Sequence, residues 1–374
     1  MSGGVDSSVA AWLLREQGHD VIGVFMRHGQ MPEGVAASAG HKQGCCTADD
    51  ATDARRVADM LGIPFYALDF QKEFTRIVDY FVAQYTVGRT PNPCIVCNTW
   101  LKFGKLFDYA DRLGAEYVAT GHYARLIAFE GSDLALCRGL DDSKDQSYVL
   151  FGIQRHLLPR LMFPIGEHRK EAIRRIAEQI GLQVAAKRDS QEICFVPDQD
   201  HAGFIRRRRG EVDSSGEIVT TDGTVVGRHS GFERFTVGQR KGLKVAFGEP
   251  RYVVRVEAES RRVVIGTREE LARSELTASE ANWLVDSKAA FPPSIRIDAP
   301  PVPCPAASSG PAPAAGFRAQ VKIRYRSRPV DAVVEPLAGG RFGVCLDEPR
   351  HGIAPGQAVV CYAGDRVLGG GWIE

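Results

Sequence analysis

Strand-like apolar runs alternate with helical patterns through the first half of the chain. We expect helices at residues 7–17, 48–61, 72–87, 100–113 and 168–180, and strands at residues 20–26, 65–70 and 117–120. Gly62 follows one helical pattern at the position that often ends a helix. Helices that separate apolar strands form βαβ units, and such units build a parallel sheet. The sequence therefore predicts an α/β domain over residues 1–204.

The pattern changes after residue 204. Short strands separated by glycines dominate, at residues 224–228, 252–257, 262–266, 318–323, 330–335, 342–346 and 358–362. Closely spaced strands of this kind are typical of small β modules and closed barrels. We expect a small β-rich domain at residues 205–272 and a C-terminal β barrel at residues 273–374. Residues 299–316 are rich in Pro, Ala and Ser and predict a disordered insertion in a loop.

Composition narrows the class of protein. The chain has 374 residues, a net charge of +1 and 44% hydrophobic residues, as expected for a globular protein of two or three domains. It has no apolar run long enough to span a membrane and no signal-like start, so we expect neither a membrane partner nor secretion. Nine cysteines, an odd number, favour cytoplasmic thiols over a disulfide framework. Because the net charge is near zero, contacts with nucleic acid would depend on local patches.

The first chemical motif lies at the start of the chain, directly before a helical pattern. It consists of Ser2, Gly3, Gly4, Val5, Asp6, Ser7 and Ser8. Glycines let a backbone approach an anion, serines add hydroxyl donors, and a helix N-terminus adds N–H groups. The Gly-Lys-Ser/Thr of a Walker A loop is absent. The motif predicts a phosphate-binding loop, similar to the pyrophosphate loop of ATP enzymes that adenylate a carbonyl oxygen.

The second motif is a pair of cysteines, Cys94 and Cys97, in a stretch with two prolines that predict a rigid loop. Such a pair can form a redox couple, ligate a metal, supply a nucleophile, or simply pack. A structural zinc site usually needs four ligands, and the sequence has no second CxxC. Adjacent Cys45 and Cys46 have poor geometry for a shared site, and we expect them to pack as small thiols.

Three further segments carry polar groups at informative places. Cys194 follows a polar stretch that suits a partly exposed thiol, although a single cysteine is more often buried. Gly121 and His122 follow a strand-like run, where ligand sites of α/β proteins commonly lie, although a lone histidine is more often structural. Residues 144–147 open another helical pattern, so their polar groups either bind a ligand or cap the helix.

Taken together, these segments resemble one family, the tRNA-specific 2-thiouridylases. The matching stretches recur in order over nearly the whole chain, except for residues 299–316. They are SGGVDSS, CCTADDATDARRVADMLGIPFY, GRTPNPCIVCN, KFG, ATGHYAR, KDQSYVL, DSQEICF, FTVGQRKGL, RYRS and PGQAVV. SGGVDSS alone would indicate only the pyrophosphate-loop superfamily. The resemblance implies that the α/β domain is nucleotide-binding and similar to the adenine nucleotide alpha hydrolases, with β modules that hold RNA.

The resemblance also implies an activity. Enzymes of this family replace the 2-oxygen of the wobble uridine with sulfur in tRNAs of the Lys, Glu and Gln type. ATP, with Mg²⁺, adenylates the C2 oxygen, and a persulfide sulfur then attacks C2, so that AMP and pyrophosphate are released. The implied partners are tRNA and a sulfur-donor protein, without DNA or a membrane, and the implied location is the cytoplasm.

The family's functional positions transfer to individual residues. Cys97 matches the nucleophile and Cys194 the cysteine that carries the persulfide, so we expect both thiol pKa values to be lowered. A Cys97–Cys194 disulfide would remain after transfer and be reduced before the next turnover. Residues 2–8, Met26 and Gly121 match the ATP-binding positions, and Asn92, Pro93 and Cys94 match the segment that meets the target base. The implied tRNA contacts are His122, Lys144, Asp145, Gln146, Arg324, Tyr325 and Gln357.

The chain departs from the family pattern at two places. Many members have an acidic residue at the position of Cys94. Cys94, Cys97 and Cys194 could instead hold a [4Fe–4S] cluster whose free iron activates sulfide, and the two versions stay open. Where the family has a short strand before SGGVDSS, this chain has Met1. Since a lost central strand leaves neighbours unpaired, we expect an upstream in-frame extension that encodes an apolar β segment.

Other functional classes make different demands on the same residues. A pyrophosphate-loop ligase or amidotransferase that uses ammonia would not need Cys97 or Cys194. A non-catalytic RNA-binding protein would bind tRNA without exchanging ATP and pyrophosphate. A thiol-redox protein built on CxxC would leave SGGVDSS unexplained. The basic run at residues 206–209 either contacts phosphates or is the solvated end of a helix.

Overall fold

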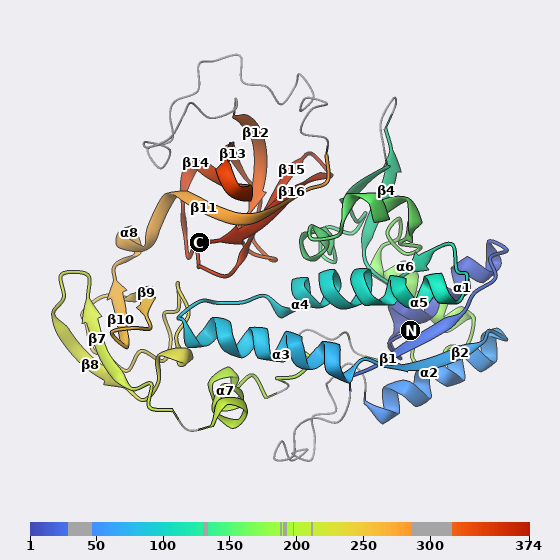
Figure 1. The fold of residues 1–374 in the computed structure, drawn as a ribbon, viewed down its shortest axis with the longest axis horizontal. Coiled ribbons are helices and arrows are strands. Elements are labelled where there is room, and N and C mark those ends of the chain that lie inside the picture. Colours follow the sequence, from blue (N-terminus) through green and yellow to red (C-terminus); the bar gives the residue numbers. More distant parts are fainter. Residues whose placement is uncertain are drawn as a thin grey trace. The chain divides into compact units, whose positions relative to one another are not determined.

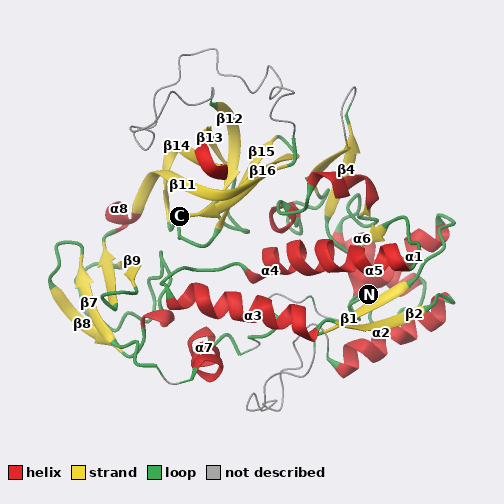
Figure 2. Ribbon diagram, viewed as in Figure 1, coloured by secondary structure: helices red, strands yellow, loops and turns green. Residues whose placement is uncertain are grey.

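A computed structural model describes residues 1–28, 47–129, 134–187, 189, 193–196, 198–210, 212–285 and 316–374. Cys45, Cys46 and residues 299–315 of the expected insertion lie outside these ranges. The chain divides into two compact units. The first contains Met1–Ile77, Cys94–Gln199 and Asp365–Val367, and the second contains Val78–Pro93, Asp200–Gly364 and Leu368–Glu374. Helices are concentrated in the first unit and strands in the second (Figure 2).

Two parallel strand pairs form the framework of the first unit. β1 (Gly23–Arg27) pairs in parallel with β2 (Phe65–Asp69), with Gly23 opposite Phe65, and helix α2 (Ala48–Leu61) lies between them in the chain (Figure 1). β3 (Val118–Ala119) pairs in parallel with β6 (Leu161–Met162). A parallel pair joined through a helix is a βαβ unit, so the predicted α/β arrangement is confirmed.

Helix α2 illustrates how local sequence sets an element's ends. Thr47 and Asp50 form a reciprocal capping box at its start. Gly62 adopts a φ of +64° at its end, as the position of this glycine predicted. The helix buries Val57 and Leu61 in a core shared with α1 (Val5–Glu16) and α6 (Lys170–Gln179). This core supports the loop that precedes α1.

The remaining elements of the first unit are shorter. They are α5 (Leu106–Arg112), the 3₁₀ helices at Ser147–Leu150 and Arg155–Arg160, and the antiparallel hairpin of β4 (Ala124–Ala128) and β5 (Leu134–Arg138). Helix α3 (Gln71–Thr86) runs from the first unit into the second. The hairpin was not anticipated from the sequence.

The cysteine-bearing stretch differs from the expected loop. It is helical from Pro93, through α4 (Pro93–Val96) and a π-helical segment (Cys97–Lys105), into α5. Proline fits the first turn of a helix, where its missing N–H has no intrahelical partner to lose. The expected rigid loop is therefore wrong: both Cys94 and Cys97 lie on a helical backbone that begins earlier than residue 100.

A four-stranded sheet forms the middle of the chain, in the second unit. Its order is β8 (Val225–His229), β7 (Gly216–Thr220), β10 (Arg262–Gly266) and β9 (Tyr252–Glu257). β7 and β10 are parallel, and the other neighbours are antiparallel. Ile218, Phe232 and Val263 belong to its buried core. Helix α7 (His201–Arg209) precedes this sheet, and the short α8 (Arg268–Leu271) follows it.

A closed barrel completes the chain. Its strands are β11 (Ala272–Trp283), β12 (Phe317–Lys322), β13 (Val330–Leu337), β14 (Arg341–His351), β15 (Ala358–Ala363) and β16 (Arg366–Ile373). They are ordered β11-β14-β13-β12-β15-β16, and β11 pairs back onto β16 with Ala278 opposite Ile373. Alternate residues of β12 enter the core. The predicted β-rich middle part and C-terminal barrel are confirmed.

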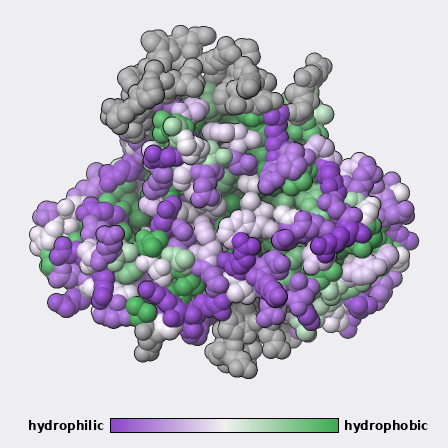
Figure 3. Space-filling model, in the orientation of Figure 1, coloured by the Kyte–Doolittle hydropathy of each residue, from purple (hydrophilic) through white to green (hydrophobic). Residues whose placement is uncertain are grey.

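The surface has the polar character expected from the composition. On the face seen in Figure 3, hydrophobic residues lie scattered among hydrophilic ones. Among the described helices, none combines the length and the apolar character needed to cross a lipid bilayer.

Candidate functional site

The loop before α1 leaves a helix N-terminus accessible. Gly4 is the N-cap residue in an extended conformation, and no side chain caps the helix within the described residues. The first N–H groups of an uncapped helix lack intrahelical partners and carry a partial positive charge. The Ser2 and Ser7 hydroxyls lie 3.1 Å apart beside this end. The hydroxyls of Ser7 (3.3 Å) and of the buried Ser8 (2.8 Å) both donate to the Gly4 carbonyl. This arrangement fits the phosphate groups of a nucleotide.

Two glycines allow close packing around the loop. Gly3 has a φ of +70°, and a Cβ there would lie 2.3 Å from the carbonyl oxygen of Asp50. A Cβ on Gly121 would lie 2.7 Å from the backbone nitrogen of Ser7. Gly121 thus lies against the loop although it is far away in sequence. Met26, the other predicted nucleotide contact, is half-buried on β1 opposite Leu68.

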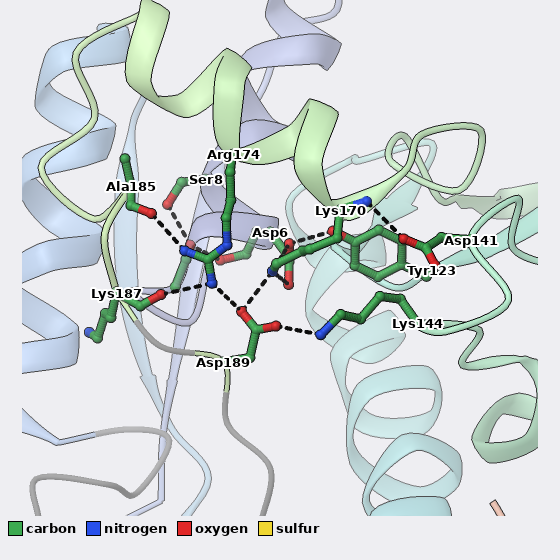
Figure 4. A network of polar contacts seen from close by, with 12 residues as sticks. Asp6, Ser8, Tyr123, Asp141, Lys144, Lys170, Arg174, Ala185, Lys187 and Asp189 are labelled. Carbon is green, nitrogen blue, oxygen red and sulfur yellow. Dashed lines mark hydrogen bonds and ion pairs between the residues drawn. The ribbon is translucent and has the colours of Figure 1, made fainter. Parts of the chain in front are cut away.

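A network of charges surrounds Asp6 of the loop (Figure 4). The Lys170 ammonium contacts both carboxylate oxygens of Asp6 (2.8 and 2.9 Å) and one oxygen of Asp189 (2.9 Å). Asp189 also pairs with Lys144 (2.7 Å) and Arg174 (2.8 Å). Burial favours a higher pKa for Asp189, but the hydrogen bonds from Lys144 and Lys170 outweigh it and lower its pKa to about 2. Asp189 is therefore ionised at neutral pH.

Tyr123 also contacts Asp6. Its hydroxyl donates to Asp6 at 2.8 Å. Burial, together with the negative charge of Asp6, raises the pKa of Tyr123, so that it stays a neutral donor. The Lys170 backbone N–H, at the start of α6, donates to Asp141 at 2.9 Å. These contacts fix the end of α6 that carries Lys170.

Lys187 connects the loop to α2. Its ammonium donates to the Gly3 carbonyl (2.9 Å), Asp50 (2.6 Å) and Asp53 (2.9 Å). Burial opposes its charge, but the hydrogen bonds that Lys187 donates to the carboxylates of Asp50 and Asp53 outweigh this effect and raise the pKa of Lys187. The lysine therefore holds the loop backbone in place as a permanent cation.

Sequence reasoning missed Tyr123, Asp141, Lys170, Arg174 and Lys187. One signal was present: Lys170 lies in the first turn of its helix, where the helix dipole disfavours a cation. A cation at such a place needs a carboxylate partner, and Asp6 and Asp189 supply it. The other four residues carry no local signal, because their partners come from distant parts of the chain.

Cys94 and Cys97 lie three residues apart on the helical stretch, which places them on one face. Cys94 is exposed and Cys97 is half-buried. The buried Asn98 donates from Nδ2 to the Val149 carbonyl at 3.0 Å. Cys97 begins the π-helical segment, a type of backbone that is frequent at functional sites.

Cys194 is half-buried in a short turn. The next residue, Phe195, is buried and packs edge-on against Phe74, with 5.7 Å between ring centroids. Within the ranges described above, no three His, Cys, Asp or Glu side chains are placed to hold a metal ion. The structure therefore does not assemble Cys94, Cys97 and Cys194 as ligands of an iron–sulfur cluster.

Two of the predicted tRNA contacts are buried in the first unit. His122 packs against Phe103 and Phe163, and its Nδ1 lies 2.8 Å from the Thr120 hydroxyl. Burial, assisted by the charge of Lys102, lowers its pKa, so the imidazole is neutral at pH 7. The Asp145 carboxylate accepts hydrogen bonds from the backbone of Gly139 and from both polar groups of Ser147.

The neighbours of Asp145 also have partners within the fold. Gln146 accepts a hydrogen bond from the Tyr123 N–H at 3.0 Å, and Lys144 pairs with Asp189. Asp145 accepts a hydrogen bond from the backbone N–H of Ser147, the first residue of the 3₁₀ helix at Ser147–Leu150, while the N-cap residue of this helix, Gln146, makes no capping bond with its side chain. Direct contact of these residues with tRNA stays a prediction.

The remaining predicted tRNA contacts lie in the second unit. The exposed Arg324 donates to the carbonyls of Val237 and Gly352, and the Lys322 ammonium lies 6.0 Å from the centre of the Tyr325 ring. Gln357 donates to the carbonyls of Thr90 (2.9 Å) and Pro91 (3.3 Å). Gln357 thereby holds the backbone just before Asn92 and Pro93, the first two residues of the predicted target-base segment.

The basic run at the end of α7 is partly neutralised. Arg208 pairs with Asp79 at 2.8 Å, and Arg206 lies 3.7 Å from Glu233. Both sequence interpretations of this run stay open, because ion pairs at a surface are weak and phosphates can replace carboxylates.

Comparisons with known proteins cover nearly the whole chain. Three family models match it: a tRNA methyl transferase HUP domain at residues 1–198, a tRNA methyl transferase PRC-barrel domain at 202–267, and an aminomethyltransferase beta-barrel domain at 273–373. The protein from Rhodopirellula baltica named tRNA-specific 2-thiouridylase MnmA is 49% identical, over 100% of this chain and 94% of that protein. The chain belongs to the tRNA-specific 2-thiouridylase family.

Other comparisons agree with this family or add little to it. The 2-thiouridylase MnmA of Geobacter metallireducens is 46% identical, over 100% of this chain and 95% of that protein. The domain descriptions mention methyl transfer, but matches along the whole length identify a 2-thiouridylase more specifically than single domains do. The NMN synthetase of Francisella tularensis has a TM-score of 0.30 and 14% identity over 56% of this chain and 75% of its own, which is too low to relate the folds.

Proposed function

We propose that this protein is an ATP-dependent sulfurtransferase that replaces the C2 oxygen of the wobble uridine of tRNA with sulfur. The observation that supports it most is the N-terminus of α1, which no side chain caps in the described residues, with Gly121 packed closely against its first turn. This site fits a pyrophosphate group, and the names of the full-length relatives specify tRNA thiolation. The proposal includes Mg²⁺, a sulfur-donor protein, a cytoplasmic location and domains at residues 1–204, 205–272 and 273–374.

The first step of the proposed reaction activates the uridine. The C2 oxygen attacks the α-phosphorus of ATP, and pyrophosphate leaves with the electrons of the broken P–O bond. The N–H groups of α1 and the Ser2 and Ser7 hydroxyls are placed to stabilise the negative charge on the phosphates. Met26 and Gly121 complete the proposed nucleotide contacts, while Asn92, Pro93 and Cys94 present the target base.

The second step transfers sulfur. The terminal sulfur of a persulfide on Cys194 bonds to C2, and AMP leaves with the electrons of the C2–O bond. The Cys97 thiolate attacks the Cys194 sulfur and breaks the persulfide S–S bond, which leaves a Cys97–Cys194 disulfide. A thiol reductant must supply two electrons before the next turnover, and the donor protein must reload Cys194.

A thiolation assay tests the proposal. Unmodified glutamate tRNA is incubated with the protein, ATP, Mg²⁺ and a persulfide-loaded donor, and sulfur is detected by retardation in a mercury-containing gel. We expect retardation that depends on ATP. Binding of tRNA without retardation, both aerobically and after anaerobic reconstitution with iron and sulfide, would instead identify a non-catalytic RNA-binding protein.

A further inference from the structure

The part of the chain between α6 and α7 carries both Asp189 and Cys194. Between the end of α6 and the start of α7, the described residues form turns but no helix or strand. A backbone without a hydrogen-bonded ladder depends on side chains to fix its position. The contacts that hold this segment therefore determine where Cys194 lies.

Arg174 of α6 forms hydrogen bonds to this segment at three points (Figure 4). Its guanidinium donates to the carbonyls of Ala185 (2.9 Å) and Lys187 (3.3 Å) and to the carboxylate of Asp189 (2.8 Å). The planar guanidinium presents several donors in a fixed geometry, which suits three acceptors that lie close together in the chain. The segment is thus fastened to α6 as far as Asp189.

Asp189 continues this connection to the phosphate-binding loop. Lys170 contacts Asp189 at 2.9 Å and Asp6 at 2.8 Å, and only 9% of its side chain is exposed. Lys144 binds the other oxygen of Asp189 at 2.7 Å. Ion pairs that are screened from water by burial hold their geometry better than exposed ones. Asp6, Lys170 and Asp189 therefore form a continuous polar link from the loop to the segment.

Cys194 lies between this ionic link and an apolar anchor. It follows Asp189 by five residues, a stretch that spans at most about 18 Å when fully extended. Directly after it, Phe195 is buried against Phe74, and Val196 is 1% exposed. Cys194 thus lies within five residues of an ion-paired carboxylate and directly before two buried side chains.

We propose that Asp189 is a positioning residue for sulfur transfer, which anchors the Cys194 segment to the phosphate-binding loop through Lys170, Lys144 and Arg174. The inference rests on the proposed function and adds a residue to it. Lys170 has two contacts with Asp6 that do not involve Asp189. We therefore expect the loss of Asp189 to leave activation of the uridine nearly unchanged and to slow the delivery of sulfur. The alternative is that Asp189 merely stabilises the fold, in which case both steps would change together.

The test separates the two steps in a single turnover. Asp189→Asn keeps the shape of the side chain and removes its charge, and Asp189→Glu restores the charge. Asp365→Asn is the matched control, because Asp365 pairs with Arg125 at 2.7 Å in the same unit, away from this segment. Pyrophosphate release that depends on tRNA reports activation, and sulfur incorporation reports transfer.

We expect Asp189→Asn to slow sulfur incorporation about tenfold while pyrophosphate release stays close to the wild-type rate. Asp189→Glu should recover part of the loss, and Asp365→Asn should change neither rate. Equal losses in both steps, or no loss in either, would overturn the proposal.

A second readout does not depend on the reaction. Alkylation of Cys194 by iodoacetamide, followed by mass spectrometry of its peptide, reports how firmly the segment is held. We expect faster alkylation in Asp189→Asn than in wild type or Asp365→Asn, and an unchanged rate would count against the anchor. If the wild type itself failed to thiolate tRNA, the proposed function would be wrong, while the alkylation result would still judge the anchor.

Discussion

Cys97 and Cys194, the two proposed reaction partners, are held by different kinds of interaction. Cys97 lies within a continuous helical stretch from Pro93 to Arg112, between the fully buried Ile95 and Leu101. Cys194 lies in a turn, after a segment that ion pairs attach to α6 and to the phosphate-binding loop. The first position lies among backbone hydrogen bonds and apolar packing, whereas the second lies between the ion pairs of Asp189 and the buried Phe195.

This difference bears on the two roles in the proposed reaction, in which Cys194 carries the persulfide and Cys97 attacks it. The helical stretch that carries Cys97 buries Ile95 and Leu101, and its Lys105–Asp108 ion pair is about half exposed, so we expect charge to affect the position of Cys97 little. The position of Cys194 depends on Lys170, which also binds Asp6 in the loop proposed to receive ATP. Negative charge that enters this loop attracts the same lysine, so we expect the Cys194 segment to respond to the state of the loop.

The largest expected effect comes from removing either thiol. Cys97→Ala and Cys194→Ala should each abolish sulfur incorporation but leave tRNA-dependent pyrophosphate release, because only the second step needs a thiolate. Cys137→Ala is the matched control: burial raises the pKa of that thiol to about 11, so it is unreactive at neutral pH. The mercury gel measures the outcome. Full sulfur incorporation by either variant would contradict the proposed route, because the sulfur would then reach C2 without that cysteine.

A smaller effect is expected from weakening a contact of the helical stretch that carries Cys97. Asn98→Ala removes the donor to the Val149 carbonyl and should lower the free energy of unfolding by about 1–3 kcal/mol. Alkylation of Cys194 should not change, because its own anchors remain. Urea unfolding measures the first quantity. The control is Asp108→Ala on the same helical stretch, where both partners of the ion pair with Lys105 are about half exposed and the loss should be about 0.5 kcal/mol or less.

If Asn98→Ala left stability unchanged, the position of Cys97 would not depend on this contact. If it accelerated alkylation of Cys194, the two cysteines would share one support, and the contrast between them would disappear.

Sequence predicts those parts of the fold that local patterns determine. The bounds of β9 and β10 and the end of α2 at Gly62 agree with the sequence patterns, because β-branched residues and a helix-ending glycine act locally. β16 was missed because it contains three consecutive glycines, and β11 because it has few β-branched residues. Both are strands because closing the barrel gives their backbones partners, which no local pattern reveals.

In the candidate site, too, the sequence predicts local motifs but not contacts between distant residues. Its phosphate-binding loop is a contiguous motif, so the sequence predicts it directly. Lys170 could not be assigned to it, because Lys170 and Asp6 are 164 residues apart and meet only through folding. Lys187 and Arg174 likewise read as ordinary surface charges in the sequence. Ion pairs between distant elements are the part of a site that a single sequence reveals least well, since charged residues are common and the topology of the fold determines their partners.

The smallest expected effect concerns the pH dependence of the ion pairs that Asp189 makes. Asp189 faces Lys144, Lys170 and Arg174, and its pKa falls from 3.8 to about 2 as their hydrogen bonds outweigh burial. A carboxylate with a lowered folded pKa contributes stability that is present above its unfolded pKa and is lost as pH falls through the folded value. The difference in unfolding free energy between wild type and Asp189→Asn should therefore be flat from about pH 5 to pH 8.

Urea unfolding of both proteins across this range measures the difference. All other titrating groups are shared, so the subtraction isolates Asp189, and Asp365→Asn provides the same comparison for an exposed carboxylate. A difference that fell between pH 6 and pH 5 would mean that Asp189 takes up a proton there, and the three cations would then not hold it as a permanent anion. A flat difference supports an anchor for Cys194 that is fully charged throughout the pH range in which the enzyme is proposed to work.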